Sequence, residues 1–285
     1  MSFLAFLVAF GGGVFGAAIG ALPAFIMVGF LVLTGVAVQF ATGNADFFAV
    51  PFGAFGPHVG GFASGVAAAA YAANRDKFDN GRDITAGMMG LNSPDILLVG
   101  GIFGGLGYLI NWIFGLVGFP WTDSVALTVV VSAIIVRVLW GKSGVFGAVV
   151  AGEGRYSPSE AYRWVPWQSS FGQKLMIGLG AGLFSTYLAL SLGPAGAVLG
   201  FGISAASLVF LQYGTKVPVT HHITLVAAVA AAASGSYIWG TLFGILAAFV
   251  GEFMANTFCA WGDTHIDPPA ATIATLTSLS LLIQA

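Results

Sequence analysis

The first 45 residues of the chain contain no ionisable side chain, and four later stretches contain no Asp, Glu, Lys or Arg. These stretches cover residues 96–122, 175–215, 217–251 and 268–285. A soluble domain usually has about a quarter charged residues, whereas this chain has 7%. A bilayer core about 30 Å thick needs roughly 20 apolar helical residues for each crossing. The sequence therefore predicts an all-α, polytopic integral membrane protein, multi-pass in a cell or inner membrane.

Composition also excludes several classes of protein. The first 74 residues contain no Lys or Arg, so the basic region of a cleaved signal peptide is missing and residues 1–21 are expected to form a retained span. The single cysteine, Cys259, cannot form an intramolecular disulfide. A net charge of −2 without a basic stripe argues against nucleic acid as a partner. The loops are too short for a soluble catalytic domain, so we expect no enzyme activity.

The chain has 42 glycines, and several are spaced for close helix packing. Small residues four positions apart allow two helices to approach closely in lipid. A single pair of this kind is a weak signal, but a series predicts a tightly packed bundle, and we assign these glycines to packing rather than to ligand contact. The pairs are Gly12–Gly16, Gly61–Gly65, Gly100–Gly104 and Gly240–Gly244.

Two stretches, which begin near residues 10 and 180, share the order of their Gly, Gln and Pro residues. This order predicts a duplication with halves at 1–118 and 171–285, joined over 119–170 by a linker helix and an interfacial loop rich in Trp and Tyr. The alternative is that Gly/Ala-rich spans resemble one another by composition alone. The duplication pairs three prolines of each half: Pro23 with Pro194, Pro51 with Pro218, and Pro94 with Pro268.

Nine spans are expected to be helical, and two further segments are short or broken. Segment 46–57 is interrupted by Gly and Pro, and segment 217–234 occupies the corresponding place in the second half. Interrupted apolar segments in corresponding places point to a binding site. If both segments are re-entrant, nine helices cross and the halves are inverted; if both cross, the count is eleven and the halves are parallel. The nine spans are 3–20, 22–42, 58–74, 94–117, 124–141, 172–192, 194–213, 237–258 and 268–284.

Most of the basic residues lie in loop 75–93, around the central loop and at Lys216. Under either crossing count these three places lie on one side, which the positive-inside rule assigns to the cytoplasm. The N-terminus is then outside with nine crossings and inside with eleven, and the charge pattern does not choose between the two.

Ionisable groups inside membrane segments are costly, so each is a candidate functional residue. Glu252 lies near the end of an apolar span, where it could carry a proton or bind a cation, or simply bond Asn256 at the interface. Imidazole titrates near physiological pH, so the three histidines near the broken segments could also line a path. The predicted path residues are Asp46, His58, His221, His222, Glu252 and Asn256.

A short polar loop near the C-terminus offers a candidate metal site. Alternate side chains of an extended chain point the same way, so Asp263, His265 and Asp267 could converge on one divalent metal ion. Mixed nitrogen and oxygen ligands suit Zn, Mn, Fe or Ni. The alternative is a solvated turn whose aspartates cap helix ends.

These features favour a membrane transporter or channel for a small polar solute or ion, whose path lies where the two broken segments meet. The plan resembles urea, ammonium and formate channels in architecture only. One alternative is a divalent-metal-handling membrane protein, either a transporter or an intramembrane enzyme. Another is a non-catalytic subunit of a membrane complex. Beyond the lipid bilayer and its solute, the expected partner is a further copy of the chain, in a homo-oligomer.

Overall fold

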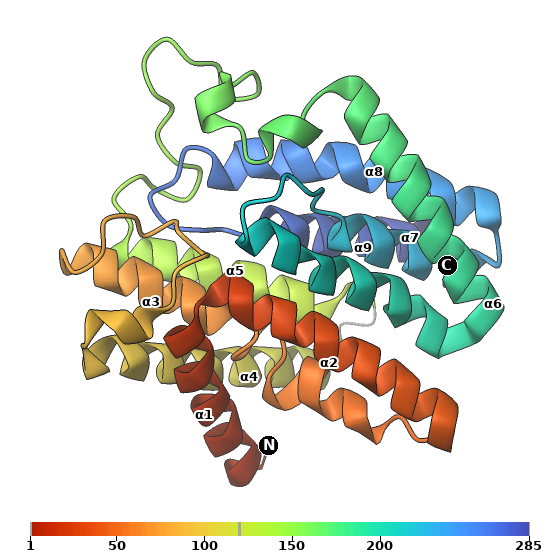
Figure 1. Ribbon diagram of the computed structural model, residues 1–285, viewed down its shortest axis with the longest axis horizontal. Coiled ribbons are helices and arrows are strands. Elements are labelled where there is room, and N and C mark those ends of the chain that lie inside the picture. Colours follow the sequence, from red (N-terminus) through yellow and green to blue (C-terminus); the bar gives the residue numbers. More distant parts are fainter. Residues whose placement is uncertain (1, 119–120, 285) are drawn as a thin grey trace.

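The computed structural model describes residues 2–118 and 121–284, and this part of the chain is helical without any β-strand (Figure 1). The expected linker 119–170 is therefore described from Trp121 onward. The α-helices of this part are α1 (Phe3–Ile19), α2 (Ala21–Thr42), α3 (Ala63–Asn74), α4 (Pro94–Val117), α5 (Ser124–Trp140), α6 (Phe171–Gln212), α7 (His221–Ser234), α8 (Tyr237–Met254) and α9 (Pro268–Gln284). Short 3₁₀ or π turns are η1 (Asp46–Ala49), η2 (Val50–Ala54), η3 (Met88–Leu91), η4 (Glu160–Tyr162), η5 (Pro166–Gln168) and η6 (Ala255–Cys259).

The all-α prediction is confirmed, and the helices fall on the expected spans except that α3 begins at Ala63, five residues after the expected start of span 58–74. Four helical segments of the described chain are long and apolar enough to cross a membrane: Ala21–Thr42, Pro94–Val117, Phe171–Gln212 and Tyr237–Cys259. Helices α1, α5 and α7 are apolar but shorter. The chain thus has the helical composition of a membrane-associated protein.

The two expected spans, 172–192 and 194–213, are two helices that meet at a kink within α6. At the kink, Gly193, which precedes Pro194, has the non-helical values φ 63° and ψ −146°. A side chain disfavours this backbone conformation, and proline interrupts the hydrogen bonds of a helix, so α6 bends here. Gly20, with φ 100°, separates α1 from α2 in a similar way.

Glycines hold the helices close, as their spacing predicts. A Cβ atom added to Gly13 in α1 would lie 2.9 Å from the Cα of Gly104 in α4. One added to Gly182 in α6 would lie 3.0 Å from the Cα of Gly244 in α8. Helices α1 and α4, and likewise α6 and α8, pack extensively on each other. The absence of side chains at these positions therefore sets the distance between the helices.

The two segments that the sequence predicts to be broken differ from each other. Residues 46–62 form η1, η2 and a series of turns before α3 begins. Residues 215–220 have no regular secondary structure, and α7 then forms a regular helix. The turns from Gly56 to Gly61 are buried against α1 and α2. Such irregular backbone is tolerated at depth where protein surrounds it.

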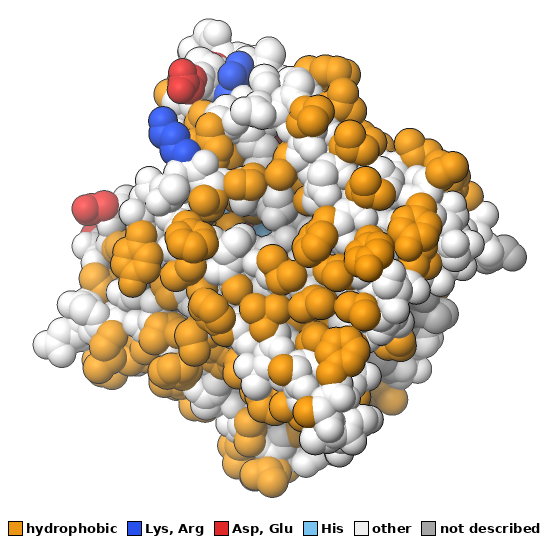
Figure 2. Space-filling view, turned by 45° about the vertical axis from the view of Figure 1, so that its right-hand side comes forward, with side chains coloured by type: hydrophobic (Ala, Val, Ile, Leu, Met, Phe, Trp, Pro, Cys, Tyr) orange, Lys and Arg blue, Asp and Glu red, His pale blue; other side chains and the backbone are white. Residues whose placement is uncertain are grey.

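The outer surface of the bundle is apolar. Large hydrophobic side chains such as Leu98 and Ile102 on α4, Leu183 on α6 and Ile238 on α8 are exposed. In Figure 2 hydrophobic side chains cover most of the visible face, and the charged side chains gather at one edge. Exposed apolar surface on this scale is uncommon in soluble monomers and suits contact with lipid.

Candidate functional site

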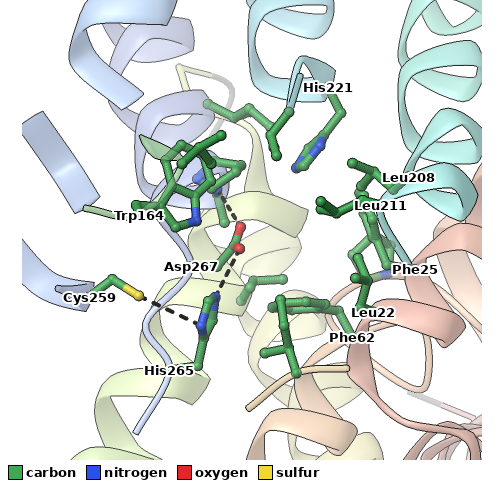
Figure 3. Close-up of a pocket in the computed structure, with 18 of the residues that line it drawn as sticks. Leu22, Phe25, Phe62, Trp164, Leu208, Leu211, His221, Cys259, His265 and Asp267 are labelled. Carbon is green, nitrogen blue, oxygen red and sulfur yellow. Dashed lines mark hydrogen bonds and ion pairs between the residues drawn. The ribbon is translucent and has the colours of Figure 1, made fainter. Parts of the chain in front are cut away.

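A cavity of about 460 Å³ lies inside the bundle, where helices from both ends of the chain meet (Figure 3). Four short helices begin at its wall. Phe62 immediately precedes α3, Asp123 precedes α5, His221 opens α7, and Asp267 precedes α9, and all four residues line the cavity. The remaining wall is mainly apolar and aromatic.

The starts of α5 and α9 are built alike. Asp123 accepts a hydrogen bond from the backbone N–H of Ala126 at 2.8 Å. Asp267 accepts one from the backbone N–H of Ala270 at 2.8 Å. Aspartate is a favoured N-cap because it satisfies an otherwise unpaired N–H and complements the helix dipole. The capping alternative proposed for Asp267 from the sequence is therefore confirmed.

Of the two carboxylates, Asp123 has fewer neighbouring groups that stabilise its negative charge. Burial raises the pKa of Asp123, although the hydrogen bonds from the backbone N–H groups of Ala126 and Val125 lower it. Asp267 also meets His265, whose Nε2 lies 3.3 Å from Oδ1. Asp123 is not among the predicted path residues, because a cap at a helix start carries no signal of the cavity beside it.

Cys259, His265 and Asp267 form a chain of contacts at one end of the cavity. The Sγ of Cys259 lies 3.7 Å from the Nδ1 of His265, whose other ring nitrogen faces Asp267. Burial alone lowers the pKa of His265, but the charge of Cys259 and the hydrogen bond to Asp267 raise it to about 9. Sequence reasoning missed Cys259 here, since its single occurrence gave no pattern.

The expected convergence of Asp263, His265 and Asp267 is wrong. The carboxylate of Asp263 accepts hydrogen bonds from the backbone N–H of Lys142, at 2.5 Å, and from the hydroxyl of Ser143, at 2.6 Å. Asp263 thus joins this loop to the end of α5 instead of facing His265. Among residues 2–118 and 121–284, no three His, Cys, Asp or Glu side chains are placed to hold a metal ion.

Three histidines are buried with ring nitrogens that lack a protein partner. These atoms are Nδ1 of His58, Nδ1 of His221 and both ring nitrogens of His222. Only His221 lines the cavity, and Figure 3 shows its ring directed inward. His222 lies behind it against Trp164, with ring centroids 6.0 Å apart. The structure therefore places one of the three predicted histidines at the site.

The other predicted path residues lie away from this cavity. Glu252 forms an ion pair with Lys174 of α6, so its observed partner is not Asn256, the one considered from the sequence. Asn256 is buried but does not line the cavity. Asp46 is exposed and accepts a hydrogen bond from Asn44. Apolar periodicity could not show that Lys174, far away in sequence, faces Glu252.

The loop expected at the headgroups covers one side of the cavity. Trp164 and Trp167 line it. Trp167 donates to the carbonyl of Val217 at 2.9 Å, and Gln168 bonds both the N–H and the carbonyl of Val219. These bonds fasten the loop to the chain that leads into α7.

Two arginines also line the cavity, and each donates hydrogen bonds to protein oxygens. Arg82 donates to the carbonyl of Ala260 at 2.6 Å. Arg163 donates to the carbonyl of Pro158 at 3.2 Å and to the hydroxyl of Ser169 at 3.3 Å. Both side chains come from loops.

Comparison with known proteins places the chain in one family. No curated protein and no solved structure matches it. One family model matches residues 1–160 and residues 151–285, which together span the chain. The chain therefore belongs to DUF7973, a family of unknown function.

Proposed function

We propose that this protein is a multi-pass integral membrane protein that transports a small solute or ion through the central cavity. The observation that carries the proposal is the meeting of four helix N-termini, those of α3, α5, α7 and α9, around one cavity. Discontinuous helices that begin at the middle of a bundle are typical of solute sites in transporters. His221, with an unpartnered buried nitrogen, and Asp123 are among the polar groups of a mainly apolar and aromatic wall.

The packing supports a repeat of five helical segments, with α5 in the first half rather than in a linker. Helix α1 packs on α4 as the first part of α6 packs on α8. Helix α3 contacts α4 and α5, and α7 contacts α8 and α9. When the two halves are aligned in this way, the capping residues Asp123 and Asp267 occupy corresponding positions. The match of Pro94 with Pro268 is not supported, because Pro94 opens α4, which corresponds to α8.

The two halves run in opposite directions through the proposed membrane. The turn between α1 and α2 lies beside loop 75–93, since a Cβ at Gly20 would lie 2.6 Å from the carbonyl of Ala86. Helix α6 bends at Gly193, and its end returns to the same loop, where Gln212 donates to the carbonyl of Thr85 at 3.1 Å. The hairpin of α1 and α2 and the hairpin formed by the two parts of α6 thus turn at opposite ends of the bundle. This arrangement favours inverted halves, with the N-terminus opposite the basic loops.

Flux through reconstituted vesicles tests the proposal. The purified protein is placed in liposomes, and a panel of solutes (urea, glycerol, acetate, ammonium, choline, sodium) is assayed for entry by light scattering. We expect at least one solute to enter faster than into empty liposomes. Leu225→Trp, from a partly exposed residue of the cavity wall, should slow that entry by filling the cavity.

Leu98→Trp is the matched control, because Leu98 is exposed on the outer face of α4. It should leave the entry rate unchanged. If no solute of the panel enters faster than in empty liposomes, or if Leu225→Trp and Leu98→Trp behave alike, the cavity is not a transport path.

A further inference from the structure

The cavity wall is rich in aromatic rings. Phe25 is central, with its ring centroid 5.9 Å from those of Phe62 and Phe201 and at steep angles to both. Trp164 faces the cavity from the covering loop, opposite Phe25 and Phe62 (Figure 3). Aromatic faces carry partial negative charge and attract cations that have lost their water. Such a wall suits an organic cation better than a hydrated metal ion, which needs oxygen ligands.

Asp123 adds a carboxylate that has no cationic partner. The ion pairs within residues 2–118 and 121–284 join Lys77 to Asp95, Lys174 to Glu252, and His265 to Asp267. Asp123 is absent from all of them, and backbone N–H groups of α5 are its hydrogen-bond donors. A carboxylate in a mostly apolar cavity is costly unless a positive group or a proton meets it. A bound cation can supply that charge.

The positive side chains of the wall do not fill this role. His265 is paired with Asp267. Arg82 and Arg163 donate to backbone carbonyls and to a hydroxyl, and neither is paired with Asp123. Asp83 also lines the cavity, but it accepts hydrogen bonds from the N–H and the hydroxyl of Thr85. Asp123 is thus a lining carboxylate whose hydrogen bonds come from backbone N–H groups alone, and His221 directs its ring into the same cavity.

We propose that the cavity binds a small alkylammonium ion, with its positive head at Asp123 and its alkyl groups against Phe25, Phe62, Phe201 and Trp164. This inference rests on the proposed function, because it names the substrate class of the same cavity. His221 would accept or donate a hydrogen bond to a polar group on the ligand.

Binding of choline and of its uncharged isostere, 3,3-dimethylbutan-1-ol, tests the inference. The full-length protein is placed in nanodiscs of phosphatidylglycerol and phosphatidylethanolamine, which contain no choline headgroup, and affinity is measured by calorimetry. The two probes have nearly the same shape, so a difference reports charge. We expect choline to bind about tenfold more tightly than the alcohol, as desolvated cation–aromatic contacts allow.

Two variants and a control localise the effect. Asp123→Asn keeps the N-cap of α5 and should weaken choline binding about tenfold while leaving the alcohol unchanged. Phe62→Leu keeps an apolar wall and should also weaken choline selectively. Asp95→Asn makes the same change at the start of α4, outside the cavity, and should have no effect.

Equal affinity for choline and the alcohol, no binding of choline, or choline binding that neither Asp123→Asn nor Phe62→Leu weakens would overturn the inference. Preferential binding of acetate would also do so, by assigning the site to anions. The flux assay is separate: binding of choline without movement of any solute would leave this inference standing and remove the transport proposal.

Discussion

At the scale of single residues, Gly107 shows how closely the helices approach. It lies in α4 against the backbone carbonyl of His58, so an added Cβ would collide with that oxygen. Backbone cannot move aside as a flexible side chain can, and overpacking usually costs about 1–3 kcal/mol, sometimes more. Gly107→Ala should therefore lower the melting temperature of the detergent-solubilised protein.

Gly115 provides the comparison within the same helix. An added Cβ there meets no atom within 4 Å, and alanine favours a helix over glycine by about 0.5–1 kcal/mol. Gly115→Ala should leave the melting temperature unchanged or raise it. A Gly107→Ala protein as stable as Gly115→Ala would show that α4 and the turn at His58 are not in contact.

His265 should make stability depend on pH. Its pKa is raised from 6.5 to about 9, so its protonated form stabilises the folded state. This contribution is complete below about pH 6.5 and is lost as the pH rises through about 9. Melting temperature measured from pH 6 to 10 should fall over that window, and the fall should be smaller in His265→Gln. Equal slopes in the two proteins would contradict the assignment.

The sequence identified polar residues well but not their partners. It placed His221, His265 and Asp267 among the candidates, because a polar side chain in an apolar stretch stands out. It could not show that Cys259 meets His265 or that Glu252 meets Lys174. Those contacts depend on how distant helices are oriented about their axes, and apolar stretches that are hydrophobic all round do not specify that orientation.

At the scale of elements, the bend of α6 depends on Gly193. Its backbone has φ 63° and ψ −146°, a region that is essentially restricted to glycine, and a side chain there costs about 1–3 kcal/mol. Gly193→Ala should lower the melting temperature accordingly. Gly180→Ala, in the straight first part of α6, meets no atom within 4 Å and has no positive φ, so it should not. Equal stability of the two variants would mean that α6 can bend without glycine.

The positions of the helices were predictable because the lengths of the apolar stretches and the positions of the prolines determine them locally. The start of α4 at Pro94 and of α9 at Pro268 agree with proline in a first helical turn. The expected pairing of those two helices depended on these prolines, and proline suits the start of any helix. The contacts of α4 and α8 with their neighbours depend on tertiary structure, and composition does not encode them.

At the scale of the whole molecule, long-range contacts gather the basic loops at one end of the bundle. Asn74 donates to the carbonyl of Trp140 at 3.1 Å, and Arg82 bonds the carbonyl of Ala260. Helix α2 begins beside this loop, since Leu22 N–H donates to the carbonyl of Ile84. A helix of 22 residues is about 33 Å long at 1.5 Å per residue. Its end at Thr42 therefore lies near the opposite face.

This geometry predicts which loops a membrane-impermeant maleimide reaches in intact cells. In a Cys259→Ser background, Asp79→Cys and Ser157→Cys should be protected, because the basic loops are retained in the cytoplasm. Ala45→Cys, just beyond α2, should react from outside. All three should react after the membrane is permeabilised. If Ala45→Cys and Asp79→Cys react from the same side, α2 does not cross the membrane. If Asp79→Cys alone reacts from outside and Ala45→Cys is protected, α2 crosses but the orientation is reversed.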